Sequence, residues 1–129
     1  MKYLDLEVED LKKVGGFHTA KEITNQPSLW KKTYSKLVEE KNQVSKFING
    51  VFENDNTEVI LTGAGTSAFI GEVLAGPFQK TWNVSCKAVG TTEIITHPEN
   101  YFSGNRSTLL ISFARSGDSP ESVAAVELA

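Results

Sequence analysis

Glycine and hydroxyl-bearing residues are concentrated in two short segments, residues 63–67 (GAGTS) and residues 112–119 (SFARSGDS). Each segment follows an apolar run that is typical of a buried strand and precedes a stretch that is typical of a helix. Glycine allows a sharp turn of the backbone, and the start of a helix presents free N–H groups with a partial positive charge. We call these segments the first and second glycine loops. Together they are predicted to cradle an anion, with phosphate as the best fit.

The two glycine loops contain several groups that suit phosphate oxygens. Hydroxyls and backbone N–H groups donate hydrogen bonds, and an arginine adds positive charge. The residues predicted to bind the phosphate are Gly65, Thr66, Ser67, Arg115, Ser116, Gly117 and Ser119. Purely structural roles stay open beside this prediction. Residues 63–65 can form a tight turn without a ligand, and Ser119 can serve only as the N-cap of a helix.

A dinucleotide site is the rival interpretation of the first glycine loop. Residues 63–68 (GAGTSA) fit the fingerprint G-x-G-x-x-A that follows a strand. That fingerprint also needs an acidic residue at the end of the second strand to hold the ribose hydroxyls. The first acid beyond that strand, Glu93, comes late. The loop also lacks the Gly-Lys-Ser/Thr ending of a P-loop, so we rank nucleotide binding below sugar phosphate binding.

Candidates for proton transfer are few. They are Glu72, Glu93, His97 and Asp118. A structural role is favoured for each of them, such as a solvated helix face for Glu72 and a first-turn helix acid for Glu93. The two histidines and the single cysteine are scattered along the chain, which predicts neither a metal site nor a catalytic triad. We therefore assign no catalytic residue, no metal and no cofactor from the sequence.

The elements that must position the two loops alternate between strand and helix. Apolar runs predict strands at residues 59–62, 84–89 and 108–113, with a helix over residues 67–80 and another that starts at Ser119. This order predicts a three-layer α/β fold with a parallel sheet, which binds ligands at the carboxyl ends of its strands. Three strands leave an apolar edge, so we expect a fragment, or a sheet that another chain completes.

The first 55 residues are predicted to form a helical extension before a domain at residues 56–129. Residues 19–22 (TAKE) have the spacing of a capping box, and Pro27 suits the first turn of a longer helix. Apolar residues then recur at helical spacing and predict one stripe, which favours packing in a core over a subunit interface. The stripe consists of Trp30, Tyr34, Leu37, Val44, Phe47, Ile48, Val51 and Phe52.

Composition narrows the class of protein. The chain has 129 residues, 40% of them hydrophobic, which suits one folded domain. A net charge of −3 without a basic stripe argues against a nucleic-acid partner. Cys86 cannot form an internal disulfide, which fits a reducing compartment. The N-terminus does not have the pattern of a signal peptide and no long apolar run is present, so we expect a cytoplasmic protein without a membrane partner.

The segments LTGAGTSAFIGE and ISFARSGDSPES resemble the two signature loops of the SIS (sugar isomerase) phosphosugar-binding domain family. The resemblance is closest to the tagatose-6-phosphate ketose/aldose isomerases, a subgroup associated with galactosamine-6-phosphate deamination and isomerisation. It covers roughly residues 57–129 and extends to the helical N-terminal segment. It implies a flavodoxin-like SIS fold that is incomplete here, because the family's domain normally has five parallel strands.

The resemblance also implies roles for individual residues. Ser67, Ser116 and Ser119 would bind the phosphate of tagatose 6-phosphate or galactosamine 6-phosphate, in an enzyme that we expect to be a homo-oligomer. Many relatives have Ser-Gln-Ser-Gly where this chain has ARSG, so one hydroxyl is missing at Ala114. Arg115 or Ser112 is expected to compensate for it.

The glutamate that these relatives use as a base lies in later sequence that is absent here. This chain alone is therefore expected to be inactive, while its parent would be a sugar-phosphate isomerase or deaminase. SIS domains also serve as ligand-binding modules in regulators. A non-catalytic sugar-phosphate sensor is for that reason an alternative function.

Overall fold

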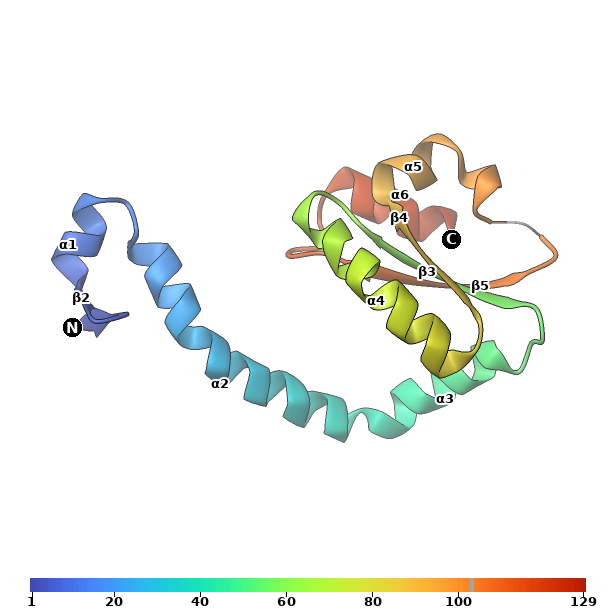
Figure 1. The fold of residues 1–129 in the computed structure, drawn as a ribbon, viewed down its shortest axis with the longest axis horizontal. Coiled ribbons are helices and arrows are strands. Elements are labelled where there is room, and N and C mark those ends of the chain that lie inside the picture. Colours follow the sequence, from blue (N-terminus) through green and yellow to red (C-terminus); the bar gives the residue numbers. More distant parts are fainter. Residues whose placement is uncertain (103) are drawn as a thin grey trace. The chain divides into compact units, whose positions relative to one another are not determined.

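The computed structural model describes residues 1–102 and 104–129. The chain divides into two compact units, Met1–Lys46 and Phe47–Ala129. The first unit is helical apart from a short hairpin, and the second is a mixed α/β unit (Figure 1). In the part of the chain that the structure describes, no helix is both long and apolar enough to cross a membrane.

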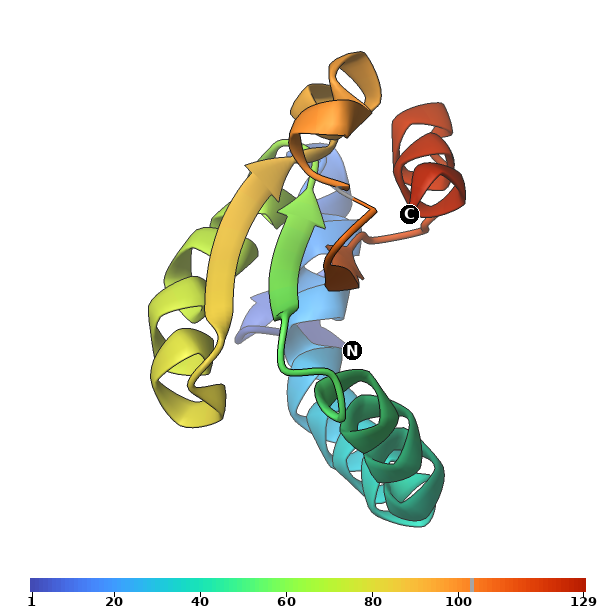
Figure 2. The same ribbon diagram turned by 90° about the vertical axis from the view of Figure 1, so that its right-hand side faces the viewer.

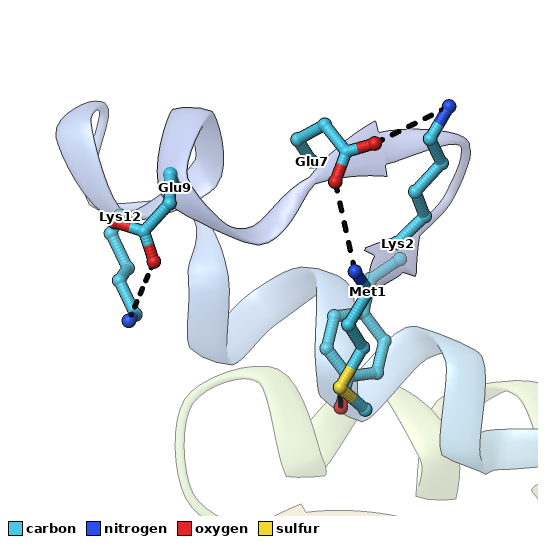
Figure 3. A network of polar contacts seen from close by, with 6 residues as sticks. Met1, Lys2, Glu7, Glu9 and Lys12 are labelled. Carbon is cyan, nitrogen blue, oxygen red and sulfur yellow. Dashed lines mark hydrogen bonds and ion pairs between the residues drawn. The ribbon is translucent and has the colours of Figure 1, made fainter.

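The first unit opens with a hairpin of two very short strands, β1 (Lys2–Tyr3) and β2 (Leu6–Glu7), which pair antiparallel. Helix α1 (Val8–Lys13) follows directly. The Glu7 carboxylate lies 3.7 Å from the terminal amino group of Met1 and 3.5 Å from Nζ of Lys2 (Figure 3). All of these groups are exposed, so their ion pairs contribute little to stability.

Helix α2 (Phe17–Glu39) contradicts two details of the prediction. It begins two residues before Thr19, so residues 19–22 lie inside the helix and form no capping box; its N-cap is Gly16, which makes no side-chain capping bond. Pro27 lies in the middle of the helix rather than in a first turn. The predicted helix start was wrong: proline removes one backbone hydrogen bond, and this 23-residue helix continues through it.

The apolar stripe is exposed along most of its length. The predicted single helix is split into α2 and α3 (Lys41–Phe52). Trp30, Tyr34 and Phe47 are 66%, 71% and 64% exposed, so the predicted core role is wrong for these residues. Only the end of the stripe, where Val51 and Phe52 pack against the sheet of the second unit, is in a core. Amphipathic spacing marks a face that is suited to burial, but it does not identify the surface that covers that face.

The second unit is built on a parallel three-stranded sheet. Its strands are β3 (Thr57–Gly63), β4 (Ser85–Gly90) and β5 (Ser107–Phe113), in the order β4-β3-β5. All residues of the central strand β3 are buried, as expected for a strand that is covered on both faces. The structure thus confirms the predicted α/β fold with a parallel sheet.

Helices cover both faces of this sheet. Helix α4 (Thr66–Trp82) packs on the face of Val59 and Leu61, whereas α5 (Thr91–Thr96) and α6 (Pro120–Leu128) pack on the opposite face with Ile60. Figure 2 shows α4 and α6 on opposite sides of the strands. A short 3₁₀ turn, η1 (Pro98–Asn100), follows α5. Both glycine loops therefore lie at the carboxyl end of the sheet, where α4 and α6 begin.

Candidate functional site

A pocket of about 350 Å³ lies at the carboxyl ends of β3 and β5. These strands are parallel neighbours, so their carboxyl ends meet at the same edge and bring the two glycine loops together. All the predicted binding residues except Gly65 line the pocket. The lining residues are Ala64, Thr66, Ser67, Phe113, Ala114, Arg115, Ser116, Gly117, Ser119 and Ser122.

The first glycine loop is a tight connection between β3 and α4. Gly65 is the N-cap of α4 and has a φ of 55°, which glycine adopts without strain. Within this turn the Ser67 amide donates to the Ala64 carbonyl at 3.2 Å. In the described residues, the hydroxyls of Thr66 and Ser67 make no hydrogen bond. Both hydroxyls are therefore available to a ligand in the pocket.

The second glycine loop presents one hydroxyl and one cation. The Ser116 Oγ accepts a hydrogen bond from the Asp118 amide at 3.4 Å, so its own hydrogen remains available for donation. Arg115 is exposed, lines the pocket and makes no ion pair in the part of the chain that the structure describes. An anion between the loops would thus meet a hydroxyl and a guanidinium from this side.

Ser119 both caps a helix and lines the pocket. It is the N-cap of α6, and its Oγ accepts a hydrogen bond from the Ser122 amide at 3.2 Å. It also lines the pocket. The capping role predicted as an alternative is therefore present, and it places Ser119 beside the space that a ligand would occupy.

The structure adds lining residues that the sequence did not single out. The most polar of them is Ser122, which is buried in the first turn of α6 and contacts the Ser119 hydroxyl. The spacing of two serines three residues apart at a helix start was the signal that could have pointed to it. Ser112, expected to compensate for the hydroxyl missing at Ala114, does not line this pocket. It lines a neighbouring cavity of about 320 Å³ beside α6.

None of the four acid–base candidates lines the pocket. Glu93 lies in the first turn of α5, and its Oε2 accepts a hydrogen bond from the Tyr101 hydroxyl at 3.2 Å. The partial burial of Tyr101 and its contact with Glu93 raise the pKa of the Tyr101 hydroxyl. His97 lies 3.3 Å from a Glu99 oxygen. Across the described residues, no group of three or more His, Cys, Asp and Glu side chains is arranged to hold a metal ion.

The chain is similar to curated sugar-phosphate enzymes over almost all of its length. It is 46% identical over 127 residues to the D-galactosamine-6-phosphate deaminase AgaS of Shewanella sp. strain ANA-3, covering 96% of this chain and 33% of that protein. It is 42% identical over 114 residues to D-galactosamine-6-phosphate deaminase AgaS of Escherichia coli, covering 88% of this chain and 30% of that protein. No family model matches the chain.

The chain is also similar in fold to solved structures of related sugar-phosphate enzymes. The fold matches a Clostridium novyi NT protein assigned as a tagatose-6-phosphate ketose/aldose isomerase, with a TM-score of 0.92 and 40% identity over 99% of this chain and 33% of that one. It also matches the tagatose-6-phosphate ketose/aldose isomerase of Escherichia coli, with a TM-score of 0.82 and 41% identity over 89% of this chain and 31% of that one. The chain thus spans about a third of the length of these relatives.

Proposed function

We propose that this chain, a homologue of part of the galactosamine-6-phosphate deaminases and tagatose-6-phosphate ketose/aldose isomerases, supplies the phosphate-binding portion of a sugar-phosphate isomerase or deaminase. The observation that carries this proposal is the pocket at the carboxyl ends of β3 and β5, which both glycine loops line. Its volume is within the range of small-molecule sites. Tagatose 6-phosphate and galactosamine 6-phosphate are the substrates proposed for the parent enzyme.

The phosphate group would lie between the first turns of α4 and α6. The N-termini of both helices offer unpaired N–H groups and a partial positive charge to an anion. Around it we place the hydroxyls of Ser67, Ser116 and Ser119, the guanidinium of Arg115, and the amides of Gly65, Thr66 and Gly117. Anchoring the phosphate in this way orients the sugar, so that its reacting carbons face groups outside the phosphate site.

The pocket offers binding groups but no base. Within the described residues, its lining contains no carboxylate and no imidazole. Proton transfer between sugar carbons requires such a group within hydrogen-bond reach of the substrate. We therefore propose that this chain alone binds without turnover and that the base belongs to the remainder of the parent. The same observation keeps a non-catalytic sugar-phosphate sensor as the second candidate.

Dinucleotide binding is less well supported than sugar phosphate binding. A Rossmann-type site holds the ribose hydroxyls with an acid at the end of the second strand. The acid nearest to that place is Glu93, whose carboxylate is engaged by Tyr101 and does not line the pocket.

The cellular location, the oligomeric state and the partner of the protein are also proposals. We infer a cytoplasmic homo-oligomer with a sugar phosphate, rather than nucleic acid or a membrane, as its partner. The net charge of −3 supports the exclusion of nucleic acid. The exposed aromatic residues Trp30 and Tyr34 on α2 support an oligomer, because large apolar side chains at one helix face favour burial.

Titration calorimetry tests the proposed function. Galactosamine 6-phosphate, tagatose 6-phosphate and the two unphosphorylated sugars are each titrated into the protein. Both phosphorylated sugars are expected to bind and the unphosphorylated sugars to bind much more weakly. Equal affinity for a sugar and its phosphate would overturn the phosphate site, and tight binding of NADH instead would favour the dinucleotide interpretation. Steady-state assays with both phosphates should show turnover well below about 1 per second, the low end of ordinary enzymes.

A further inference from the structure

We propose that Phe113 is a specificity-determining residue of the pocket, where its ring contacts the apolar face of a galactose-configured sugar phosphate. This inference rests on the proposed function, because it assigns the sugar-contacting surface of the same site. Phe113 is the last residue of β5, belongs to the second glycine loop and lines the pocket. It is half-buried and packs against the core on the α4 face of the sheet, which fixes its position at the border of the pocket.

Phe113 differs from every other described residue that lines the pocket. The others are glycine, alanine, serine, threonine and one arginine, so Phe113 is the one aromatic side chain among them. Hydroxyls and a guanidinium suit phosphate oxygens, but they do not match the C–H groups of a sugar ring. An aromatic ring offers a flat apolar face with partial negative charge, which attracts C–H groups. Phe113 thus complements the part of the ligand that the phosphate-binding groups leave uncontacted.

The register of the sheet leaves Phe113 without a side-chain neighbour in its own row. Phe113 pairs with Gly63 on β3, and Gly63 pairs with Gly90 on β4. The last row across these three described strands therefore contains two glycines and one phenylalanine. Neither glycine has a side chain that could cover the ring from the adjoining strands. In this row the sheet presents a single apolar side chain, at the edge where both glycine loops lie.

The shape of galactose-configured sugars suits one apolar platform. In their pyranose ring the hydroxyl at C4 is axial, so the C–H groups at C3, C4 and C5 lie on one face. In the glucose configuration the C4 hydrogen lies on the opposite face, so these C–H groups do not form one surface. Contact of this face with Phe113 removes apolar surface from water and thereby favours the galactose configuration. Galactosamine 6-phosphate has this configuration at C4, and tagatose 6-phosphate shares it.

The test compares galactosamine 6-phosphate with glucosamine 6-phosphate, which differ only at C4, and with inorganic phosphate. Calorimetry is performed on the unaltered protein and on Phe113→Leu, in which leucine keeps an apolar side chain but removes the aromatic face. The unaltered protein is expected to prefer galactosamine 6-phosphate by about threefold to tenfold, the usual value of an aromatic contact. Phe113→Leu should lose this preference and bind inorganic phosphate as before. Phe47→Leu, at an exposed position of α3 outside the pocket, is the matched control and should keep the preference.

A purely structural role of Phe113 predicts a different result. Phe113→Leu would then weaken the binding of all three ligands by the same factor and keep the preference, and this inference would fail. It would also fail if the unaltered protein bound the two amino sugar phosphates equally well. If the unaltered protein bound neither sugar phosphate in preference to the free sugar, the proposed function would fail and this inference with it.

A measurement on the unaltered protein gives a second test that does not depend on a variant. NMR should detect nuclear Overhauser contacts between the ring protons of Phe113 and the C3, C4 and C5 protons of bound galactosamine 6-phosphate. Contacts from these sugar protons to other residues but not to the Phe113 ring would overturn the inference, even if Phe113→Leu failed to fold.

Discussion

A Cβ atom on Gly63 would lie 2.7 Å from the carbonyl carbon of Ser67. The end of the central strand and the first turn of α4 are therefore in contact through backbone atoms at this point. The close approach brings the start of α4, with its unpaired N–H groups, directly to the carboxyl edge of the sheet. It is the local feature that gives the first glycine loop its shape.

We expect Gly63→Ala to destabilise the protein by about 1–3 kcal/mol, because the new methyl group meets backbone atoms that cannot move aside like a flexible side chain. Urea unfolding followed by circular dichroism measures the change. Gly50→Ala is the matched control, since a Cβ at this position in α3 meets nothing within 4 Å and the next residue is not a proline. That variant should be neutral or stabilising, as alanine is the better helix former. Equal stability of the two variants would contradict the prediction.

The hydroxyls at the centre of the proposed site should dominate its affinity. Ser67→Ala and Ser116→Ala are each expected to weaken the binding of galactosamine 6-phosphate by about tenfold to a hundredfold, the value of one hydrogen bond to a charged group. Neither change should lower the melting temperature much, because neither hydroxyl donates a hydrogen bond within the described structure. Ser28→Ala on exposed α2 is the control for binding. Unchanged affinity in both loop variants would remove the glycine loops from the site.

The two roles of Ser119 can be separated by charge. Ser119→Ala should lower the free energy of unfolding by about 1 kcal/mol, since α6 loses the hydroxyl that caps the Ser122 amide. Ser119→Asp should keep the stability, because aspartate is an equally good N-cap. It should nevertheless bind sugar phosphates far more weakly, because its carboxylate would repel the phosphate. If Ser119→Asp bound the sugar phosphate normally, Ser119 would lie outside the phosphate site.

The sequence predicts the sheet and the two loops because their signals are local. Short apolar runs define β3 and β5, and glycines with hydroxyl residues follow each of them, so parallel pairing suffices to bring the loops together. The Ser119 cap was equally visible, with Pro120 at the first helical position.

Features that depend on packing were not predictable in the same way. Pro27 favours a helix start in the sequence, but α2 continues through it at the loss of one backbone hydrogen bond. The apolar stripe that includes Trp30 predicts a core face, yet Trp30 is exposed. The spacing of apolar residues does not specify which surface, if any, buries them. The serine spacing at residues 119 and 122 is compatible with a place for Ser122 near the site, but its burial and its position beside two cavities depend on tertiary packing.

Alkaline pH should lower the stability of the protein through two groups. Burial of Cys86 between the sheet and α4 raises the pKa of its thiol above the usual 9.0. The pKa of Tyr101 is raised above the usual 10.0, first by partial burial and then by its hydrogen bond to Glu93. Above the pKa of the unfolded chain, the folded protein retains these protons while the unfolded chain releases them. The free energy of unfolding therefore falls as the pH rises.

Urea unfolding at pH 8, 9.5 and 10.5 measures this effect. Stability should be constant up to about pH 8, fall as Cys86 of the unfolded chain ionises, and fall further as its Tyr101 ionises. Tyr101→Phe should remove the part of the loss that appears above about pH 10, because phenylalanine has no proton to release. Cys86→Ala should remove the part that begins near pH 9, at the cost of a small cavity beside Leu61. A stability that stays level or rises between pH 8 and 10.5 in the unaltered protein would contradict both assignments, since a raised pKa in the folded state can only lower stability in this direction.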